Sequence, residues 1–293
     1  MTPLIIPLPG NEKLADALAR LLPGERGAIE TRAFPDGETY LRFATDVRGR
    51  SVILVETLDR PNPKALPLLF AADAARDLGA ARLVLAAPYL AYMRQDRRFH
   101  PGEAVTSVTF AGLVSRAFDA LVTVDPHLHR YASLGALYSI PGEVVHAAPL
   151  LAIWIAANVS APLLIGPDSE SEQWVSEVAR RAGAPYRVLQ KQRFGDRQVE
   201  IIIPDLHGLT DRTPVLVDDI ISSARTMIEA ARKLRDQGFR PPTCVAVHAL
   251  FAAEAEKELQ VVAGRLVSTN TVAHHSNDID VSGAIAEALR RLI

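Results

Sequence analysis

Short, continuous runs of apolar residues recur along the chain, and amphipathic stretches separate most of them. The runs are SVILVE, RLVLAAPY, ALVTVD, PLLIGPD, PVLVDD and CVAVHALF. Stretches such as LPLLFAADAARDLGA and TMIEAARKLRDQGF carry apolar residues at helical spacing. Strands that are apolar on both faces are typical of parallel sheets covered by helices. The pattern therefore predicts an α/β fold of mostly parallel sheets flanked by helices.

A strand that ends in an acid occurs twice, as LVTVDPH at 121–127 and as VLVDDII at 215–221. The two segments are separated by about one domain length, and 293 residues suffice for two domains. The repeat indicates an internal duplication, with two similar α/β halves joined near Pro149.

Composition limits the classes of partner. The net charge of −2 and a pI of about 6.5 imply no broad basic face, so we expect no nucleic-acid partner. The single cysteine, Cys244, excludes an intrachain disulfide framework and a multi-cysteine zinc site, and its apolar neighbours predict a buried position. A lone cysteine also suits the cytoplasm, and no basic segment followed by a long apolar run opens the chain, so we expect no signal peptide and a cytoplasmic protein.

One uncharged stretch, 147–165, approaches the length that spans a membrane. Polar residues and prolines interrupt it, at Pro149, Asn158, Ser160 and Pro162. We therefore predict a short buried helix over 150–157, a turn and a buried strand over 163–165, and no membrane partner.

The segment VLVDDIISSART places two acids and then small hydroxylated residues after a buried strand. Ligands of open parallel sheets bind beyond the carboxyl ends of the strands. Asp218 and Asp219 can accept hydrogen bonds from sugar hydroxyls or bind a hydrated divalent cation. The turn 222–226 leads into a helix whose first N–H groups attract phosphate. A pentose phosphate would fit both features, because the acids would bind its hydroxyls and the turn would bind its phosphate. The equally weighted alternative is a helix with an ordinary acidic and serine cap.

Two cationic segments are candidate phosphate sites. Arg94, Arg97 and Arg98 crowd one loop, in which arginine forks match phosphate oxygens, although a solvated charge run has the same composition. Lys191 and Arg193 precede a glycine, which suits a mobile cationic lid or a solvated hairpin.

Two further segments carry polar groups beside turns or strand ends. VDPHLHRY contains Asp125, His127 and His129, and Asp168 in IGPDSES is a candidate third metal ligand. By ligand type alone these side chains suit zinc or another transition metal before magnesium, and satisfied polar residues at a strand end are the alternative. The Asp-Gly pair in AFPDGETYLRF predicts a hairpin.

Taken together, the segments resemble the ribose-phosphate pyrophosphokinase family, which makes phosphoribosyl pyrophosphate (PRPP). The resemblance is collinear over nearly the whole chain: PGNEKLADALA, FPDGETYLRF, PYLAYMRQD, VDPHLHRY, GPDSES, KQR, VLVDDIISSART, HALF and VSTNTV. DDIISSART alone is typical of any phosphoribosyltransferase, whereas the ordered set is specific. The segments DDIIS and FHPGEAVTS are closer to the archaeal-like branch of this family than to the usual bacterial enzymes.

The resemblance implies two phosphoribosyltransferase-like domains. Residues 1–147, joined by a terminal helix over 281–293, would form the ATP side, and residues 148–280 the ribose 5-phosphate side. It also implies the reaction, in which ATP and ribose 5-phosphate give PRPP and AMP with Mg²⁺ as cofactor. An adenine site completed by a neighbouring subunit would require a homo-oligomer of at least two chains.

The resemblance also implies roles for individual residues. Catalysis would involve Lys191 and Arg193 on the closing loop, and Arg193 would also bind ribose 5-phosphate. ATP would be bound by Phe34, Asp36, Gly37, Glu38, Arg94 and Gln95. The ribose hydroxyls and the 5-phosphate would be bound by Asp218, Asp219, Ser222, Ser223, Ala224, Arg225 and Thr226. The metal ligands would be His127 and Asp168.

Two departures from the family pattern leave alternatives open. Arg225 stands where the family usually has glycine, and SESE at 169–172 replaces small, glycine-rich residues. One alternative is a non-catalytic relative that regulates a true synthase. The other is a phosphoribosyltransferase that consumes PRPP, against which the segments RQD and KQR and the second α/β half argue.

Overall fold

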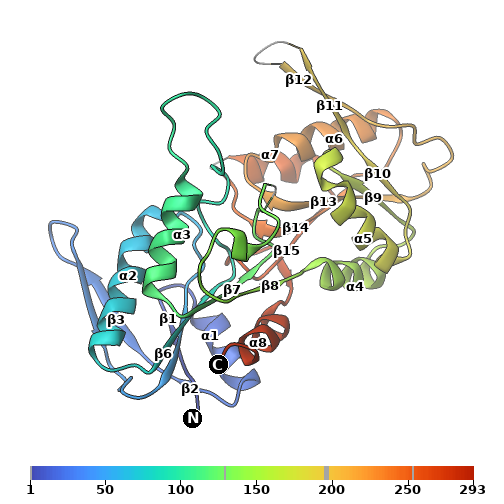
Figure 1. Ribbon diagram of the computed structural model, residues 1–293. Coiled ribbons are helices and arrows are strands. Elements are labelled where there is room, and N and C mark those ends of the chain that lie inside the picture. The colour runs from blue at the N-terminus through green and yellow to red at the C-terminus, as the bar shows by residue number, and fades with distance from the viewer. Residues whose placement is uncertain (1, 129, 195–197, 253) are drawn as a thin grey trace. The chain divides into compact units, whose positions relative to one another are not determined.

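The computed structural model describes residues 2–128, 130–194, 198–252 and 254–293, and its chain divides into two compact units (Figure 1). Unit 1 consists of Met1–Val145, Thr271–Ala273 and Val281–Ile293. Unit 2 consists of His146–Asn270 and His274–Asp280. The chain therefore returns to unit 1 after most of unit 2 is complete.

The described residues of unit 1 form one six-stranded, fully parallel sheet in the order β2-β1-β5-β6-β7-β8. Its strands are β1 (Leu4–Pro7), β2 (Glu25–Arg26), β5 (Ser51–Val55), β6 (Arg82–Ala87), β7 (Ala120–Val124) and β8 (Gly142–Val145). A separate antiparallel hairpin is formed by β3 (Ile29–Ala33) and β4 (Thr39–Phe43). It contains the predicted Asp-Gly turn.

Helices cover this sheet in two pairs (Figure 1). The helices are α1 (Glu12–Leu21), α2 (Asn62–Asp77), α3 (Thr106–Ala117) and α8 (Ser282–Arg290), with a short 3₁₀ turn, η1 (Leu134–Ala136). Helix α2 packs against α3, and α1 packs against α8, which also contacts β7 and β8. Apolar residues of α8 are fully buried there, so the last helix completes the core of unit 1.

Unit 2 repeats the plan with a six-stranded parallel sheet among its described residues, in the order β10-β9-β13-β14-β15-β16. Its strands are β9 (Pro162–Gly166), β10 (Tyr186–Val188), β13 (Thr213–Ile221), β14 (Thr243–Ala249), β15 (Arg265–Thr269) and β16 (Asn277–Ile279). The hairpin is β11 (Gln190–Phe194) with β12 (Gln198–Ile202). The helices are α4 (Ala148–Asn158), α5 (Glu172–Ala182), α6 (Arg225–Asp236) and α7 (Ala255–Val262), with η2 (Ser169–Ser171).

The two units share one topology. Each sheet has the same order when its strands are counted from its own first strand, and each chain segment inserts an antiparallel hairpin between its second and third sheet strands. Helix α4 contacts α5 and β16 in unit 2, as α8 contacts α1 and β8 in unit 1. The predicted α/β fold with two mostly parallel, helix-covered sheets is confirmed.

The apolar runs are the central strands, as predicted. All seven residues of β14 are buried, including Cys244, whose burial raises the pKa of the thiol to about 12. The uncharged stretch forms α4 and then β9 instead of one long helix. Among the described residues, no helix combines the length and the apolar character needed to cross a membrane.

Candidate functional site

In unit 2, three carboxylates gather at the carboxyl edge of the sheet. Asp218 and Asp219 lie near the end of β13, and Asp168 follows the neighbouring strand β9. The pKa of Asp218 is raised well above its ordinary value, first by burial of the carboxyl group and then by the negative charges of Asp219 and Asp168. The Asp219 N–H donates to Asp218 Oδ1 at 2.9 Å, which partly offsets that effect.

The strand then turns sharply into α6. Ala224 has φ 54°, in the left-handed region, and α6 begins at Arg225. No side chain of the described residues caps this helix, so the N–H groups of its first turn lack side-chain acceptors. Ser222 is half-buried, whereas Ser223 and Arg225 are exposed. The turn therefore combines free helix-start N–H groups, hydroxyls and a cation, which suits a phosphate.

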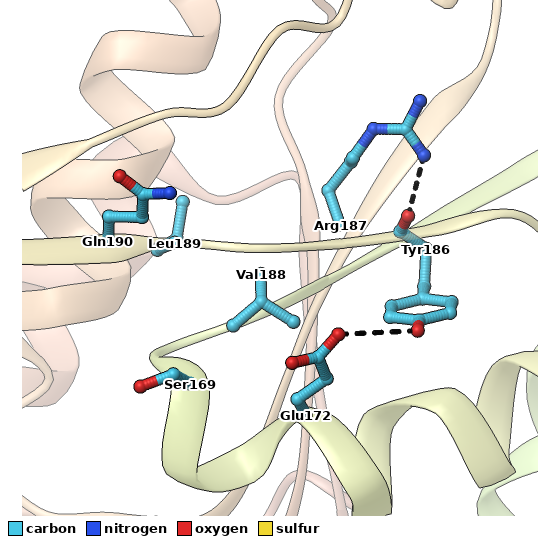
Figure 2. A pocket seen from close by; sticks show the side chains of 7 residues that line it. All are labelled: Ser169, Glu172, Tyr186, Arg187, Val188, Leu189 and Gln190. Atoms are coloured by element: carbon cyan, nitrogen blue, oxygen red, sulfur yellow. Dashed lines mark hydrogen bonds between the residues drawn. The ribbon is translucent and has the colours of Figure 1, made fainter.

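Asp168 also organises the start of α5. Its Oδ1 accepts the N–H of Ser171 at 3.1 Å, while the Ser171 hydroxyl lies 3.4 Å from the N–H of Asp168, which together form a capping box. Glu172 turns toward β10, where its Oε1 lies 3.4 Å from the hydroxyl of Tyr186 (Figure 2). The acid that departs from the family pattern at 172 thus has a neutral partner on an adjacent strand.

A pocket of about 440 Å³ lies beside the start of α5, and Figure 2 draws the side chains that line it. Ser169 and Glu172 line one side of it, and residues 186–190 line the other. Gln190, one of the residues that line the pocket, is the first residue of β11. The backbone of β11 carries Lys191 opposite Ile201 and Arg193 opposite Val199. The side chains of 191–201, and the loop 195–197, lie outside the described part of the chain.

In unit 1, Arg94 and Gln95 lie on the long loop between β6 and α3. Arg94 is exposed, and the Gln95 carbonyl accepts the N–H of Ser107 at 3.3 Å. The carboxylate of the next residue, Asp96, lies 3.4 Å from Arg130 Nε. The base of the arginine loop is therefore held by the start of α3 and by the segment after β7.

The tip of the β3–β4 hairpin carries Phe34, Asp36, Gly37 and Glu38. Gly37 has φ 92°, and the Asp36 carboxylate accepts the N–H of Glu38 at 3.1 Å, so the turn is built by its own residues. Phe34 is 38% exposed, which leaves part of its ring accessible to a ligand.

Sequence reasoning missed a neighbour of this tip. The Arg32 guanidinium lies 4.6 Å from the centre of the Phe34 ring and 4.3 Å from that of Tyr40, in cation–π geometry. The signal was present, because alternate residues of a strand share a face and Arg32 and Phe34 are two apart.

The histidine segment follows β7. Asp125 has φ 32°, and His127 is half-buried in the loop after it. His129 lies outside the described residues, so the predicted shared face of the two histidines stays a prediction. His127 belongs to unit 1 and Asp168 to unit 2, so the structure describes the position of each residue only within its own unit.

The donor set of unit 2 fits a hard divalent cation. Carboxylate oxygens are preferred ligands of Mg²⁺, and here three of them share one sheet edge. Mutual repulsion already raises the pKa of Asp218, and a nearby dication relieves that repulsion. The carboxylate of Asp168, one of the two expected metal ligands, is therefore of the type that suits magnesium.

A parallel α/β unit with an acid pair, a hydroxylated turn and an uncapped helix start defines a phosphoribosyltransferase-type protein. The family model described as a phosphoribosyl transferase domain matches residues 133–277. The model of the N-terminal domain of ribose phosphate pyrophosphokinase matches residues 4–117. The chain belongs to the ribose-phosphate pyrophosphokinase family.

Relatives of similar length support this assignment. The ribose-phosphate pyrophosphokinase of Methanopyrus kandleri is 37% identical over 284 residues, which are 96% of each chain. That of Saccharolobus solfataricus is 35% identical and covers 94% of this chain and 96% of its own. Both sources are archaeal, as the archaeal-like motif forms predicted.

A solved structure shows the fold. The phosphoribosylpyrophosphate synthetase of Mycobacterium smegmatis superposes with a TM-score of 0.86 at 24% identity, covering 100% of this chain and 99% of that one.

Proposed function

We propose that this chain is an active ribose-phosphate pyrophosphokinase. It transfers the pyrophosphoryl group of ATP to the anomeric hydroxyl of ribose 5-phosphate, giving PRPP and AMP. The observation that carries the proposal is the acid pair of β13 directly before an uncapped, hydroxylated helix start. Full-length similarity to proteins named for this activity supports it.

The sugar phosphate is bound by unit 2. The carboxyl oxygens of Asp218 and Asp219 accept hydrogen bonds from the ribose hydroxyls. The 5-phosphate lies at the turn from Ser222 to Thr226, including Ser223 and Ala224. The exposed guanidinium of Arg225 adds a charge-assisted donor where close approach of the backbone is limited by its side chain.

ATP is bound by unit 1. The exposed fork of Arg94 and the amide of Gln95 bind phosphate oxygens. Phe34, Asp36, Gly37 and Glu38 at the hairpin tip bind the adenine, with the accessible Phe34 ring as the stacking surface. The hairpin completes the site of a neighbouring chain, so the active form is a homo-oligomer.

Asp168 and His127 are the residues that would hold magnesium, and the ion would supply positive charge to the phosphate oxygens of ATP. The chain's own contribution at this point is to orient the Asp168 carboxylate through its capping contacts with Ser171.

The chemical step is an in-line displacement. The anomeric hydroxyl releases its proton to solvent as its oxygen forms a bond to the β-phosphorus, while the bond from that phosphorus to the bridging oxygen breaks and AMP leaves with that oxygen. Lys191 and Arg193 on the β11–β12 hairpin close over the reacting phosphates, and Arg193 also contacts the sugar phosphate. Because the lid closes on the reacting complex, its charges stabilise the transition state more than the free substrates.

The domains divide this work. Residues 1–147 with 281–293 form the ATP side, and residues 148–280 form the ribose 5-phosphate side. The protein acts in the cytoplasm, where both substrates are available.

Incubation of the purified protein with ATP, Mg²⁺ and ribose 5-phosphate tests the proposal. We expect AMP and PRPP in equal amounts by chromatography, and neither product when ribose 5-phosphate is omitted. Absence of AMP at every substrate level would overturn the proposal in favour of a regulatory subunit. Nucleoside monophosphate formed from PRPP and a free base, without ATP, would instead identify a phosphoribosyltransferase.

A further inference from the structure

Three side chains of the types that bind metal ions converge in unit 2, and none of them belongs to the site described above. Glu256 lies in the first turn of α7, and His274 and His275 lie in the loop between β15 and β16. One ligand atom from each lies within 4.8 Å of the ligand atoms of the other two. The side chain of His274 is 15% exposed and that of Glu256 is 24% exposed, whereas His275 is 64% exposed and opens the cluster to solvent.

One pair of ligand atoms already has the spacing that a single small cation requires. His274 Nε2 lies 3.3 Å from Glu256 Oε2, and His275 Nε2 contacts the other carboxylate oxygen, Oε1. Two nitrogen or oxygen ligands of a tetrahedral zinc ion at its usual bond lengths are ~3.4 Å apart. To bring all three atoms into one coordination sphere, the exposed side chain of His275 would have to withdraw from its contact with the carboxylate.

The His274 ring is also held in a ligating orientation. Its Nδ1 lies 2.7 Å from the hydroxyl of Ser276, and that hydroxyl lies 2.7 Å from the hydroxyl of Ser268. Asn277 donates to Ser268 at 2.9 Å, so the hydrogen-bond chain continues into the buried strand. The Ser276 N–H also donates to Nδ1 at 3.2 Å, and these contacts together fix the orientation of the ring, with Nε2 facing Glu256.

A simple ion pair explains less of this arrangement. One imidazolium would suffice to pair Glu256, and a surface pair with the exposed His275 stabilises little. Here the centroids of the two imidazole rings lie 4.3 Å apart, and both rings contact the same carboxylate. One divalent cation can be bound by all three side chains at once.

We propose that Glu256, His274 and His275 bind a divalent transition metal, with zinc the best match for two nitrogen ligands and one carboxylate. Water fills the remaining coordination position on the His275 side. The bound ion ties the β15–β16 loop to α7. This site is separate from the magnesium ligands proposed above, which are Asp168 and His127.

Metal titration of the full chain tests the site directly. The protein is freed of metal with a chelator and titrated with Co²⁺ in excess Mg²⁺, which occupies the oxygen-rich site. We expect one equivalent of Co²⁺ with a visible absorption band typical of nitrogen and oxygen ligation, and loss of that band on addition of Zn²⁺. His127→Ala is expected to keep the band, because its side chain is outside the cluster.

Substitutions in the cluster give the decisive comparison. His275→Ala changes an exposed side chain, and we expect it, like Glu256→Gln, to weaken Co²⁺ binding at least ~10-fold. His207→Ala, an exposed histidine elsewhere in unit 2, is the matched control and is expected to bind as the wild type does. Zinc should also raise the melting temperature of the wild type but not of His275→Ala. Wild-type binding by His275→Ala, or no stoichiometric binding by the wild type, would overturn the proposal.

Discussion

Glu56 shows how one buried acid can govern stability. It follows β5, is 2% exposed, and contacts Asn11 Nδ2 at 3.2 Å and Lys64 Nζ at 3.3 Å. Burial raises the pKa of its carboxyl to about 7, although the nearby Lys64 ammonium and the hydrogen bond from Asn11 lower it in part. The folded protein therefore keeps a proton that the unfolded chain loses at lower pH.

This residue predicts a pH dependence of stability. Between the ordinary pKa of 4.5 and the folded value of about 7, unfolding releases a proton, so rising pH favours unfolding. The loss amounts to about 3 kcal/mol and is complete above the folded pKa. Glu56→Gln stays neutral and should remove this contribution.

Melting temperatures measured at about pH 5 and about pH 8 check this prediction. The melting temperature should fall less between these two pH values in Glu56→Gln than in the wild type. Glu258→Gln, at an exposed position on α7, is expected to follow the wild type. Equal falls in all three proteins would show that Glu56 does not carry the effect.

Lys191 carries the residue-scale prediction for catalysis. Lys191→Ala should lower kcat by ~10²-fold or more, the scale of losing one preorganised donor to a developing charge, with a smaller change in KM. Steady-state AMP production measures both constants. Lys13→Ala, an exposed lysine on α1, is the control with unchanged kcat. A near-normal kcat in Lys191→Ala would remove the lid role.

At the scale of elements, six interior strands were predicted, whereas the interior strands β1 and β15 and the edge strands were not. The predicted runs correspond to β5, β6, β7, β9, β13 and β14, because strands buried on both faces must be apolar throughout. The short edge strand β2 and the terminal strand β16 carry polar residues such as Glu25 and Asn277, and tertiary pairing alone makes them strands.

The candidate site was also predictable only in part. The acid pair and the hydroxylated turn could be predicted, because their residues are contiguous in sequence. The Glu256–His274–His275 cluster was not, because its members are brought together by the fold across 18 residues.

The turn between β13 and α6 carries the element-scale prediction. Ala224 has φ 54°, where a Cβ is unfavourable and glycine is not. Ala224→Gly should therefore raise the free energy of unfolding by up to about 1 kcal/mol, despite the added flexibility of the unfolded chain. Ala230→Gly, inside the same helix, should lower it by about 1 kcal/mol or more. Urea denaturation of both variants checks the opposite signs, and destabilisation by Ala224→Gly would contradict the prediction.

At the scale of the whole molecule, unit 1 depends on residues from the far end of the chain. Ile285 and Leu289 of α8 are buried against α1, β7 and β8. Arg290 donates to the Leu21 carbonyl at 2.6 Å, and Arg291 pairs with Glu143 at 2.8 Å. The exposed ion pair contributes little, so the buried apolar residues provide most of the stabilisation.

Removal of residues 281–293 should therefore destabilise unit 1 selectively. We expect limited proteolysis to cleave unit 1 of the truncated protein, while unit 2 stays protected, because an apolar face of its sheet loses its cover. Arg291→Ala, which removes only a surface pair, is the control and should resist proteolysis as the wild type does. Equal protection of unit 1 in the truncated protein would contradict this view of α8.

The late arrival of α8 has a consequence during synthesis. A ribosome that has finished Val145 must add all of unit 2 before it reaches Val281, on the order of ten seconds at usual elongation rates. For that interval the nascent first half exposes the surface that α8 will cover, and it is open to chaperones and proteases. A truncated mRNA would thus yield a protein that lacks α8 and stays exposed to proteases. Its proposed nucleotide-binding residues would nevertheless already be present.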